Sequence, residues 1–348
     1  MMPMTTFPDG TLSPAPWRRA LVTGGAGFLG SHLCERLLAS GAGVDCLDNL
    51  STGHADNIGR LTGRPGFRFL EYDVADPACP DALAGPYDLV LHLAGPASPT
   101  DGLERPLEVL DAAGRGTRNA LAVADRHGAR FLLASAPADD GDSPLAPPPP
   151  APGDAADPLA PRTAYVEAQR FSEALVAAHA GARGSNAGIV RLFAVHGPRM
   201  RTDDGRMIPV FVRQALAGEP VTVAGDGSRP CSLCYVDDAV DGMLLVAAGR
   251  SVRPVDLGSD EETTAGEVAR RVIELTGSRS PLVYVAPPAA PTPRTERPRP
   301  ATGFAHELFG WSPKVPWEEG LERTVAALTG GSGRTPAVVT GHDDEWPP

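Results

Sequence analysis

The sequence lacks a block of positive charge and any long apolar run. Its formal net charge is −12, and neither Lys nor Arg is clustered. Because sequence-independent binding to nucleic acid requires many cations that neutralise phosphates, we expect no nucleic-acid partner. No apolar stretch approaches the ~18 residues of a membrane-spanning helix, and the first residues lack the basic start and apolar core of a signal peptide. These absences predict a soluble, cytoplasmic protein with no membrane partner.

The sequence also lacks a cysteine framework. Its cysteines are odd in number and scattered, which is not the pattern of a disulfide-bonded domain. One pair has C-x-x-C spacing, but no second pair and no histidine cluster accompanies it, so we expect no metal site. The cysteines are Cys34, Cys46, Cys79, Cys231 and Cys234.

A regular alternation of short apolar strands and amphipathic helices is present. Hydrophobic residues make up 42% of the chain, which suffices for a sizeable buried core. Patterns that alternate in this rhythm are typical of βαβ units and a parallel sheet. The sequence therefore predicts an α/β fold of the Rossmann type, a doubly wound parallel sheet with a smaller C-terminal lobe. The expected strands cover 20–23, 44–47, 67–72, 89–93, 131–135 and 189–193, and the expected helices cover 31–39, 107–127 and 165–178.

A glycine-rich turn lies between the first expected strand and the first expected helix. Gly24 permits the tight turn, Gly27 lets the backbone approach a pyrophosphate, and Gly30 permits close contact between helix and strand. The phosphates would then lie at the helix N-terminus, where unpaired N–H groups favour an anion. Asp48 ends the second strand and can accept hydrogen bonds from both ribose hydroxyls. Because its charge would repel a 2′-phosphate, the motif predicts NAD rather than NADP.

Later strand ends add residues to the predicted cofactor site. Those that end the third strand would flank the adenine ring, and those that end the fourth would bring backbone close to the cofactor. The expected cofactor-binding residues in this part of the chain are Gly24, Gly27, Phe28, Leu29, Gly30, Asp48, Asn49, Thr52, Gly53, Asp73, Val74, Leu93 and Ala94.

Further motifs make the chain resemble extended short-chain dehydrogenases of the NAD-dependent epimerase/dehydratase family, and within it the UDP-glucuronate decarboxylases. The resemblance runs from about Arg19 to Leu328. It is carried by VTGGAGFLGSH (22–32), DNLSTG (48–53), HLAGPASP (92–99), RLFAVHGPRM (191–200), GDGS (225–228), CYVDD (234–238) and GWSPKVP (310–316).

The resemblance implies an activity, a substrate and an assembly. In that family, C4 of UDP-glucuronate is oxidised with NAD, the β-keto acid loses carbon dioxide, and the ketone is reduced or released. A Tyr-x-x-x-Lys pair handles the C4 proton, since the lysine cation makes the tyrosine more acidic. A Thr-Ser-Glu run supplies a hydroxyl and a carboxylate. A nucleotide sugar, most directly a UDP-sugar, and a homodimer formed through the helices at 107–127 and 165–178 are the partners implied.

This chain departs from that pattern at the catalytic positions. Tyr165 is retained and is expected over the nicotinamide, but Gln169 stands at the lysine position and brings no charge to the ribose. Both are expected to contact the cofactor. The Thr-Ser-Glu run is replaced by residues 136–138, Ala-Pro-Ala. Five further positions differ. They are Ala113, Gly102, Ala194, His196 and Cys231, where the family has Asn, Tyr, Asn, Tyr and Arg, in that order.

Two groups of residues remain as candidates for the substrate site. His196 would follow a core strand and face the cleft, where it is a candidate replacement acid or base; a hydrogen-bonded loop histidine is the favoured interpretation. Tyr165 and His196 are therefore the catalytic candidates. The expected substrate-binding residues are Pro96, Ser98, Arg162, Arg199, Arg229 and Arg297.

The same patterns predict the domain organisation. Residues 18–195 are expected to form an NAD-binding domain, completed by parts of 230–260, and 196–329 to form mainly a substrate-binding lobe. Residues 1–17 and 330–348 are expected to be flexible. A proline-rich loop occupies much of 143–161.

Three functions are compatible with these observations. The first is an enzyme that modifies a nucleotide sugar by an altered route, as in sugar or secondary-metabolite biosynthesis. The second is a pseudoenzyme that binds NAD and pairs with an active relative. A conventional decarboxylase whose missing groups are replaced by neighbours ranks third.

Overall fold

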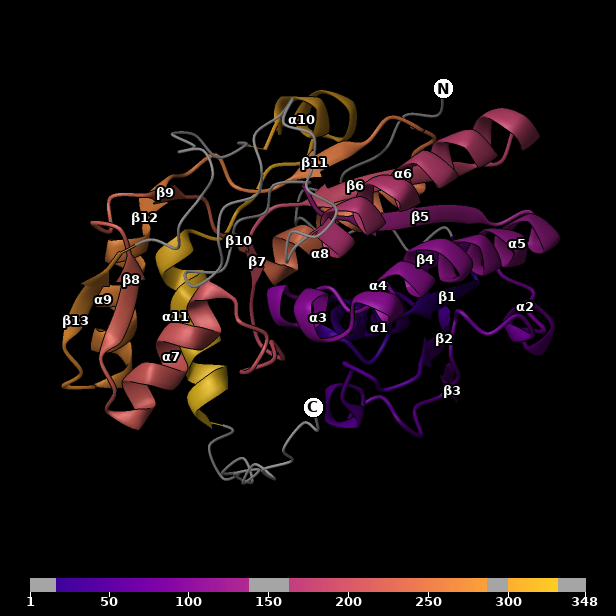
Figure 1. Cartoon of the computed structure of the whole chain (residues 1–348). Helices are drawn as coiled ribbons and strands as arrows, with labels where there is room; N and C mark the ends of the chain where they lie inside the picture. Colours follow the sequence, from indigo (N-terminus) through magenta and orange to yellow (C-terminus); the bar gives the residue numbers. More distant parts are fainter. Residues whose placement is uncertain (1–16, 138–162, 287–299, 331–348) are drawn as a thin grey trace, which may run out of the picture.

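The computed structural model describes residues 17–137, 163–286 and 300–330 and is built around a seven-stranded parallel sheet (Figure 1). The strand order β11-β6-β5-β4-β1-β2-β3 changes winding direction between β1 and β4, which confirms the doubly wound fold expected from the sequence. The strands are β1 (Arg19–Thr23), β2 (Gly43–Asp48), β3 (Phe67–Glu71), β4 (Leu89–His92), β5 (Arg130–Ser135), β6 (Ala187–Leu192) and β11 (Val255–Leu257).

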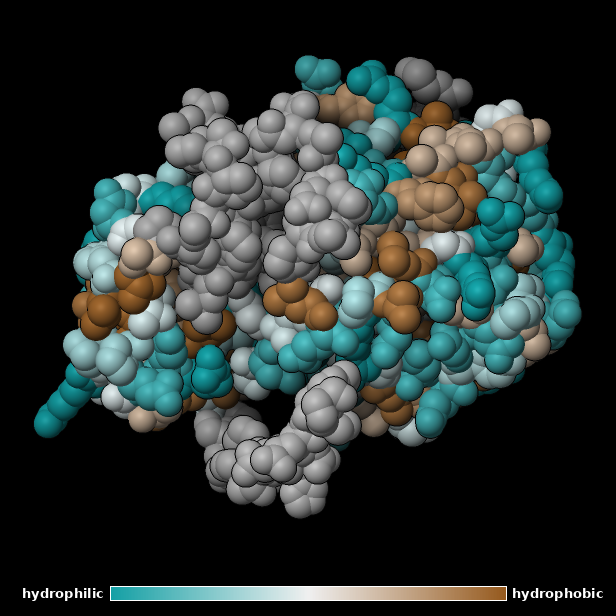
Figure 2. Space-filling model, viewed as in Figure 1, coloured by the Kyte–Doolittle hydropathy of each residue, from teal (hydrophilic) through white to brown (hydrophobic). Residues whose placement is uncertain are grey.

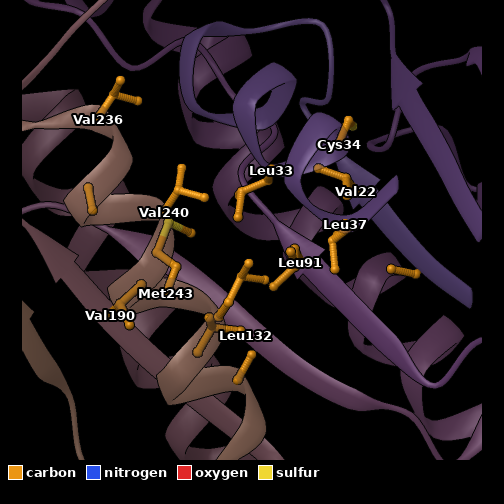
Figure 3. Close-up of a cluster of buried hydrophobic side chains, with 14 of the residues drawn as sticks. Val22, Leu33, Cys34, Leu37, Leu91, Leu132, Val190, Val236, Val240 and Met243 are labelled. Atoms are coloured by element: carbon orange, nitrogen blue, oxygen red, sulfur yellow. The ribbon is translucent and has the colours of Figure 1, made fainter. Parts of the chain in front are cut away.

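Helices cover both faces of the sheet because successive strand residues point to opposite sides. Val22 belongs to a buried cluster with Leu33 of one helix and Val240 of another (Figure 3). Its neighbour Leu21 belongs to the cluster on the other face, together with Val176. The first face carries α1 (Phe28–Ala39) and α8 (Val236–Ala248), and the second carries α5 (Thr117–His127) and α6 (Thr163–Arg183).

The helix expected at 107–127 is interrupted. It consists of α4 (Pro106–Asp111), a π-helical turn (Ala112–Gly116) and α5. Gly114 and Gly116 weaken the regular helix here, and Gly116 approaches the 73–76 loop so closely that a Cβ would lie 2.9 Å from Val74 Cγ1. Such turns recur at functional sites, and this one borders the cavity described below.

The C-terminal lobe has its own apolar core beside the sheet. It is built by α7 (Met207–Ala217), β8 (Val221–Ala224), β9 (Pro230–Cys231), β12 (Thr263–Thr264), α9 (Ala265–Thr276), β13 (Leu282–Val285) and α11 (Trp317–Gly330). Thr264 and Glu267 cap α9 reciprocally. The remaining elements are a 3₁₀ turn (Ala55–Asn57), α2 (Cys79–Ala82), α3 (Pro99–Glu104), β7 (Val195–His196), β10 (Cys234–Tyr235) and α10 (Gly303–Phe309).

Several expectations concern residues that the structure does not describe. The N-terminal segment up to residue 16, the proline-rich loop and the tail beyond residue 330 lie outside the described residues. Within the described ranges, no helix combines the length and apolarity needed to cross a membrane. All five cysteines lie in these ranges and none forms a disulfide. The cytoplasmic location stays a prediction.

Candidate functional site

A cavity of about 780 Å³ lies where the parallel strands end. Ligands of open α/β sheets bind at this edge, beside the point where the strand order reverses. Every residue expected to contact the cofactor lines the cavity, from Gly24 in the first turn to Tyr165 and Gln169 on α6. Residues of the C-terminal lobe close its other side. The sequence thus predicted residues that the fold does bring together, while their binding roles stay predictions.

The glycine turn leaves no room for side chains. Gly24 has φ +71°, and a Cβ there would lie 2.8 Å from the backbone of Leu93 and Ala94. A Cβ at Gly30 would collide with the carbonyl oxygen of Gly24. Gly27 caps α1 without a side-chain hydrogen bond, so the first N–H groups of the helix remain available to an anion. This cradle fits the pyrophosphate of a dinucleotide.

Asp48 is fixed at the end of β2 by backbone donors. Its Oδ2 accepts a hydrogen bond from the Ala26 N–H at 2.9 Å, and its Oδ1 accepts one from the Leu50 N–H at 2.8 Å. Burial raises the pKa of this carboxyl, while the backbone hydrogen bonds oppose the shift. A Cβ at Gly53 would lie 2.8 Å from Oδ1. The carboxylate is therefore held rigidly where it can accept hydrogen bonds from ribose hydroxyls.

The loop after β3, on one side of the cavity, is held by a residue that the sequence did not reveal. Asn119 on α5 donates from Nδ2 to the carbonyl oxygens of Val74 and Asp76, at 2.9 and 2.8 Å. These bonds fix the loop that also carries Asp73. The sequence around Asn119 does not indicate this role, because Val74, one of its hydrogen-bond partners, lies 45 residues away along the chain.

At the catalytic end, Gln169 is anchored to the end of β5. The Ser135 hydroxyl lies 3.2 Å from Gln169 Oε1 and 2.8 Å from Glu173 Oε1. Arg191 in turn donates to Glu173 at 2.8 and 2.6 Å. The chain contains a single lysine, Lys314, and it does not line the cavity. No other lysine can therefore replace the missing cation.

The other departures replace polar residues of the family by small apolar ones. Ala136 and Ala194 line the cavity, where they offer only methyl groups. Gly102 lies against Tyr165: a Cβ added at Gly102 would be only 3.2 Å from the Tyr165 Cβ. Ala138 lies outside the described residues. Among the described residues of the altered run, neither Ala136 nor Pro137 carries a hydroxyl or a carboxylate.

The prediction that His196 faces the cleft is wrong. The side chain is 1% exposed and does not line the cavity. Its Nδ1 lies 3.0 Å from Thr324 Oγ1, its ring packs edge-on against Tyr235, and its buried Nε2 has no hydrogen-bond partner among the described residues. Burial lowers its pKa to about 3. Its neighbour Val195 lines the cavity, and α11 covers the side of β7 to which His196 points.

The predicted substrate-binding residues divide into three groups. Pro96, Ser98 and Arg199 line the cavity. Arg229 does not line it. Arg162 and Arg297 lie outside the described residues.

Two of the lining residues also have structural partners. The Ser98 hydroxyl accepts a hydrogen bond from the Asp101 N–H at 3.0 Å and so caps α3. Arg199 adopts φ +69° and pairs with Glu35 of α1 at 2.5 Å. Sequence reasoning missed Arg201 and Arg206, which also line the cavity. Both follow the GPRM motif (197–200) closely in the sequence, and this position could have indicated that they belong to the site.

The described residues contain no group of three or more His, Cys, Asp or Glu side chains placed to hold a metal ion. Cys231 and Cys234 are both buried, and burial raises the pKa of the Cys234 thiol. A deprotonated thiolate, the form that binds metal, is therefore disfavoured at that position.

Comparison with known proteins gives consistent matches. Residues 20–257 match the model of the NAD dependent epimerase/dehydratase family. UDP-glucuronic acid decarboxylase 1 from Danio rerio is 37% identical over 314 residues, covering 90% of this chain and 73% of that protein. UDP-glucuronic acid decarboxylase 5 from Arabidopsis thaliana is 36% identical over 327 residues, covering 91% and 93%. The structure of a Thermus thermophilus UDP-glucose 4-epimerase in complex with NAD is 28% identical, with a TM-score of 0.72, covering 90% of this chain and 99% of that one.

Proposed function

The chain belongs to the NAD dependent epimerase/dehydratase family, and from this premise we propose that it is an enzyme that modifies the sugar of a UDP-sugar. The family and its cofactor, NAD, are those expected from the sequence. One observation carries the proposal: a single cavity joins the glycine turn and Asp48 to Tyr165 and the arginines of the C-terminal lobe. A dinucleotide and a second ligand can therefore meet within it.

The chemistry of the site follows from its polar groups. Bound NAD would supply reversible hydride transfer with a sugar carbon. We propose that Tyr165, which lines the cavity, exchanges a proton with a sugar hydroxyl. Gln169, anchored by Ser135, can hydrogen-bond a ribose but places no cation beside the phenol. Proton transfer should therefore be slower than in relatives that keep the lysine, and we propose that the reaction differs from conventional decarboxylation.

A pseudoenzyme is the second candidate, and it has a specific observation in its favour. The cofactor turn is intact, while Ala136 and Ala194 offer no polar side-chain group and Gln169 no cation at the catalytic end. Such a protein would hold NAD and pair with an active relative.

We also propose a homodimer formed through α4 and α6. Apolar side chains gather on the surface over these helices (Figure 2). Leu107 is 76% exposed, Leu110 44% and Phe171 51%, whereas Leu175 is partly buried against the core. Exposed apolar groups of this size, on neighbouring helices, favour burial against a second copy.

Turnover assays distinguish the enzyme from the pseudoenzyme. The protein would be incubated with NAD and a panel of UDP-sugars, and the products followed by NMR. Consumption of one sugar that Tyr165→Phe abolishes supports the enzyme. Binding of NAD and UDP without turnover of any sugar on the panel supports the pseudoenzyme.

A further inference from the structure

Two arginines beside the catalytic end are already engaged by carboxylates. Arg201 Nη1 lies 2.9 Å from each carboxylate oxygen of Asp101. Arg206 Nε lies 3.7 Å from Asp204 Oδ2, and Arg206 Nη2 donates to the carbonyl oxygen of Ala97 at 2.6 Å. These contacts link the C-terminal lobe to the segment that begins α3, so the positions of both cations are fixed across the two lobes.

The pair formed by Asp101 and Arg201 lies close to the catalytic tyrosine. Both residues line the cavity together with Tyr165. Asp101 directly precedes Gly102, where an added Cβ would lie 3.2 Å from the Tyr165 Cβ. Asp101 is only 2% exposed, so its charge is shielded mainly by Arg201 and little by solvent.

The other arginines on the cavity wall are paired in the same way. Each described arginine that lines the cavity forms an ion pair with a carboxylate. The pairs are Arg105–Glu108, Arg115–Asp111, Arg199–Glu35, Arg201–Asp101 and Arg206–Asp204.

A sugar carboxylate would disturb the pair formed by Asp101 and Arg201. Beside Asp101 it would meet a like charge in a partly desolvated site. If it took Arg201 for itself, Asp101 would remain buried without its cation, which is costly. Ala136 and Ala194 offer no side-chain hydrogen-bond donor in compensation.

We infer, on the basis of the proposed function, that the substrate is a UDP-linked sugar without a carboxylate, and that Asp101 is the residue that disfavours a uronate. The diphosphate does not affect this comparison, because UDP-glucose and UDP-glucuronate share it. The two ligands differ only at C6, which is a CH₂OH group in UDP-glucose and a carboxylate in UDP-glucuronate.

Calorimetry on the NAD-loaded protein tests the inference with UDP, UDP-glucose and UDP-glucuronate. UDP-glucose is expected to bind at least about tenfold more tightly than UDP-glucuronate. Equal affinities, or a preference for UDP-glucuronate, would overturn the inference while leaving the proposed function intact. If neither UDP nor either sugar binds, the proposed function fails and the inference fails with it.

A charge-removing variant assigns the effect to its residue. Asp101→Asn keeps the side-chain shape and releases Arg201, so the ratio of the two affinities should shift toward UDP-glucuronate by about tenfold. Asp125→Asn is the matched control, because Asp125 pairs with His179 and Arg183 and does not line the cavity. An unchanged ratio in a folded Asp101→Asn protein would remove the role assigned to Asp101. Should that variant not fold, the ratio in the unmodified protein still decides whether the site disfavours a uronate.

Discussion

The Ser135 hydroxyl lies 3.2 Å from Gln169 Oε1 and thereby joins the end of β5 to the second turn of α6. Ser135 is also 2.8 Å from Glu173, which Arg191 holds by two hydrogen bonds. The glutamine is therefore part of an ordered polar chain. A residue fixed in this way can still orient a ribose, which explains how cofactor binding can persist when the lysine is absent.

Restoring the lysine alone should rescue little decarboxylation. A positioned acid or base typically contributes ~10²–10⁴-fold, and groups that act as a unit are not additive. Gln169→Lys supplies a cation, but Ala136 still lacks the hydroxyl. Carbon dioxide release from UDP-glucuronate should therefore stay slow in this variant. The matched comparison adds Ala136→Thr, Pro137→Ser and Ala138→Glu to Gln169→Lys. Several turnovers per second by the unmodified protein would contradict the altered-site interpretation.

Removing the Asp48 carboxylate should weaken NAD binding. Hydrogen bonds to a charged group contribute about 1.5–3 kcal/mol each, so Asp48→Ala should lower the affinity roughly tenfold or more. The unmodified protein should bind NAD more tightly than NADP, and the variant should lose that preference. Asp81→Ala, on an exposed side chain paired with Arg126, is the control. Tighter binding of NADP by the unmodified protein in calorimetry would refute the assignment.

Two buried histidines should make the protein sensitive to acid. Burial lowers the pKa of His196 to about 3 and that of His92 to about 4, whereas an unfolded histidine titrates near 6.5. The unfolded chain therefore binds more protons, and stability falls as the pH drops below about 6.5. Each histidine should lower the free energy of unfolding by about 1.5 kcal/mol between pH 6.5 and pH 5. Urea unfolding at both pH values measures this loss, and His196→Asn should reduce it by about 1.5 kcal/mol. An equal loss in the variant would contradict the role of His196.

The sequence predicted the parallel sheet and the residues that gather around the glycine turn because those features are local. A glycine turn between a strand and a helix has one common geometry, and Asp48 ends the next strand along. The position of His196 was mispredicted because α11 covers it from more than a hundred residues away along the chain. The pairing of Arg201 with Asp101 also spans a hundred residues. Contacts of that kind depend on how the two lobes pack, which local patterns do not encode.

A charge placed on the exposed apolar surface should prevent dimer formation. Leu107 is 76% exposed on α4, so Leu107→Glu should leave the fold intact and introduce an unpaired carboxylate into the proposed interface. Light scattering at tens of micromolar should give a dimer for the unmodified protein and a monomer for the variant. Leu308→Glu on α10 provides the control, since Leu308 is also exposed but lies on a different helix. A monomeric unmodified protein would exclude the dimer.

A methyl group at Gly30 should disrupt the cofactor site, whereas the same change at Gly181 should not. The Cβ of Gly30→Ala would collide with the carbonyl oxygen of Gly24, and backbone cannot yield as a flexible side chain does. We expect a loss of stability of about 1–3 kcal/mol from the forced shift, and NAD affinity at least tenfold lower because the turn that holds the pyrophosphate must move. Gly181 lies within α6 with open space around its Cβ position. There alanine should raise stability by roughly 0.5–1 kcal/mol through its better helix propensity and leave NAD binding unchanged. Thermal unfolding with and without NAD measures both effects, and equal NAD affinity in the two variants would show that the close contact at Gly30 does not shape the site.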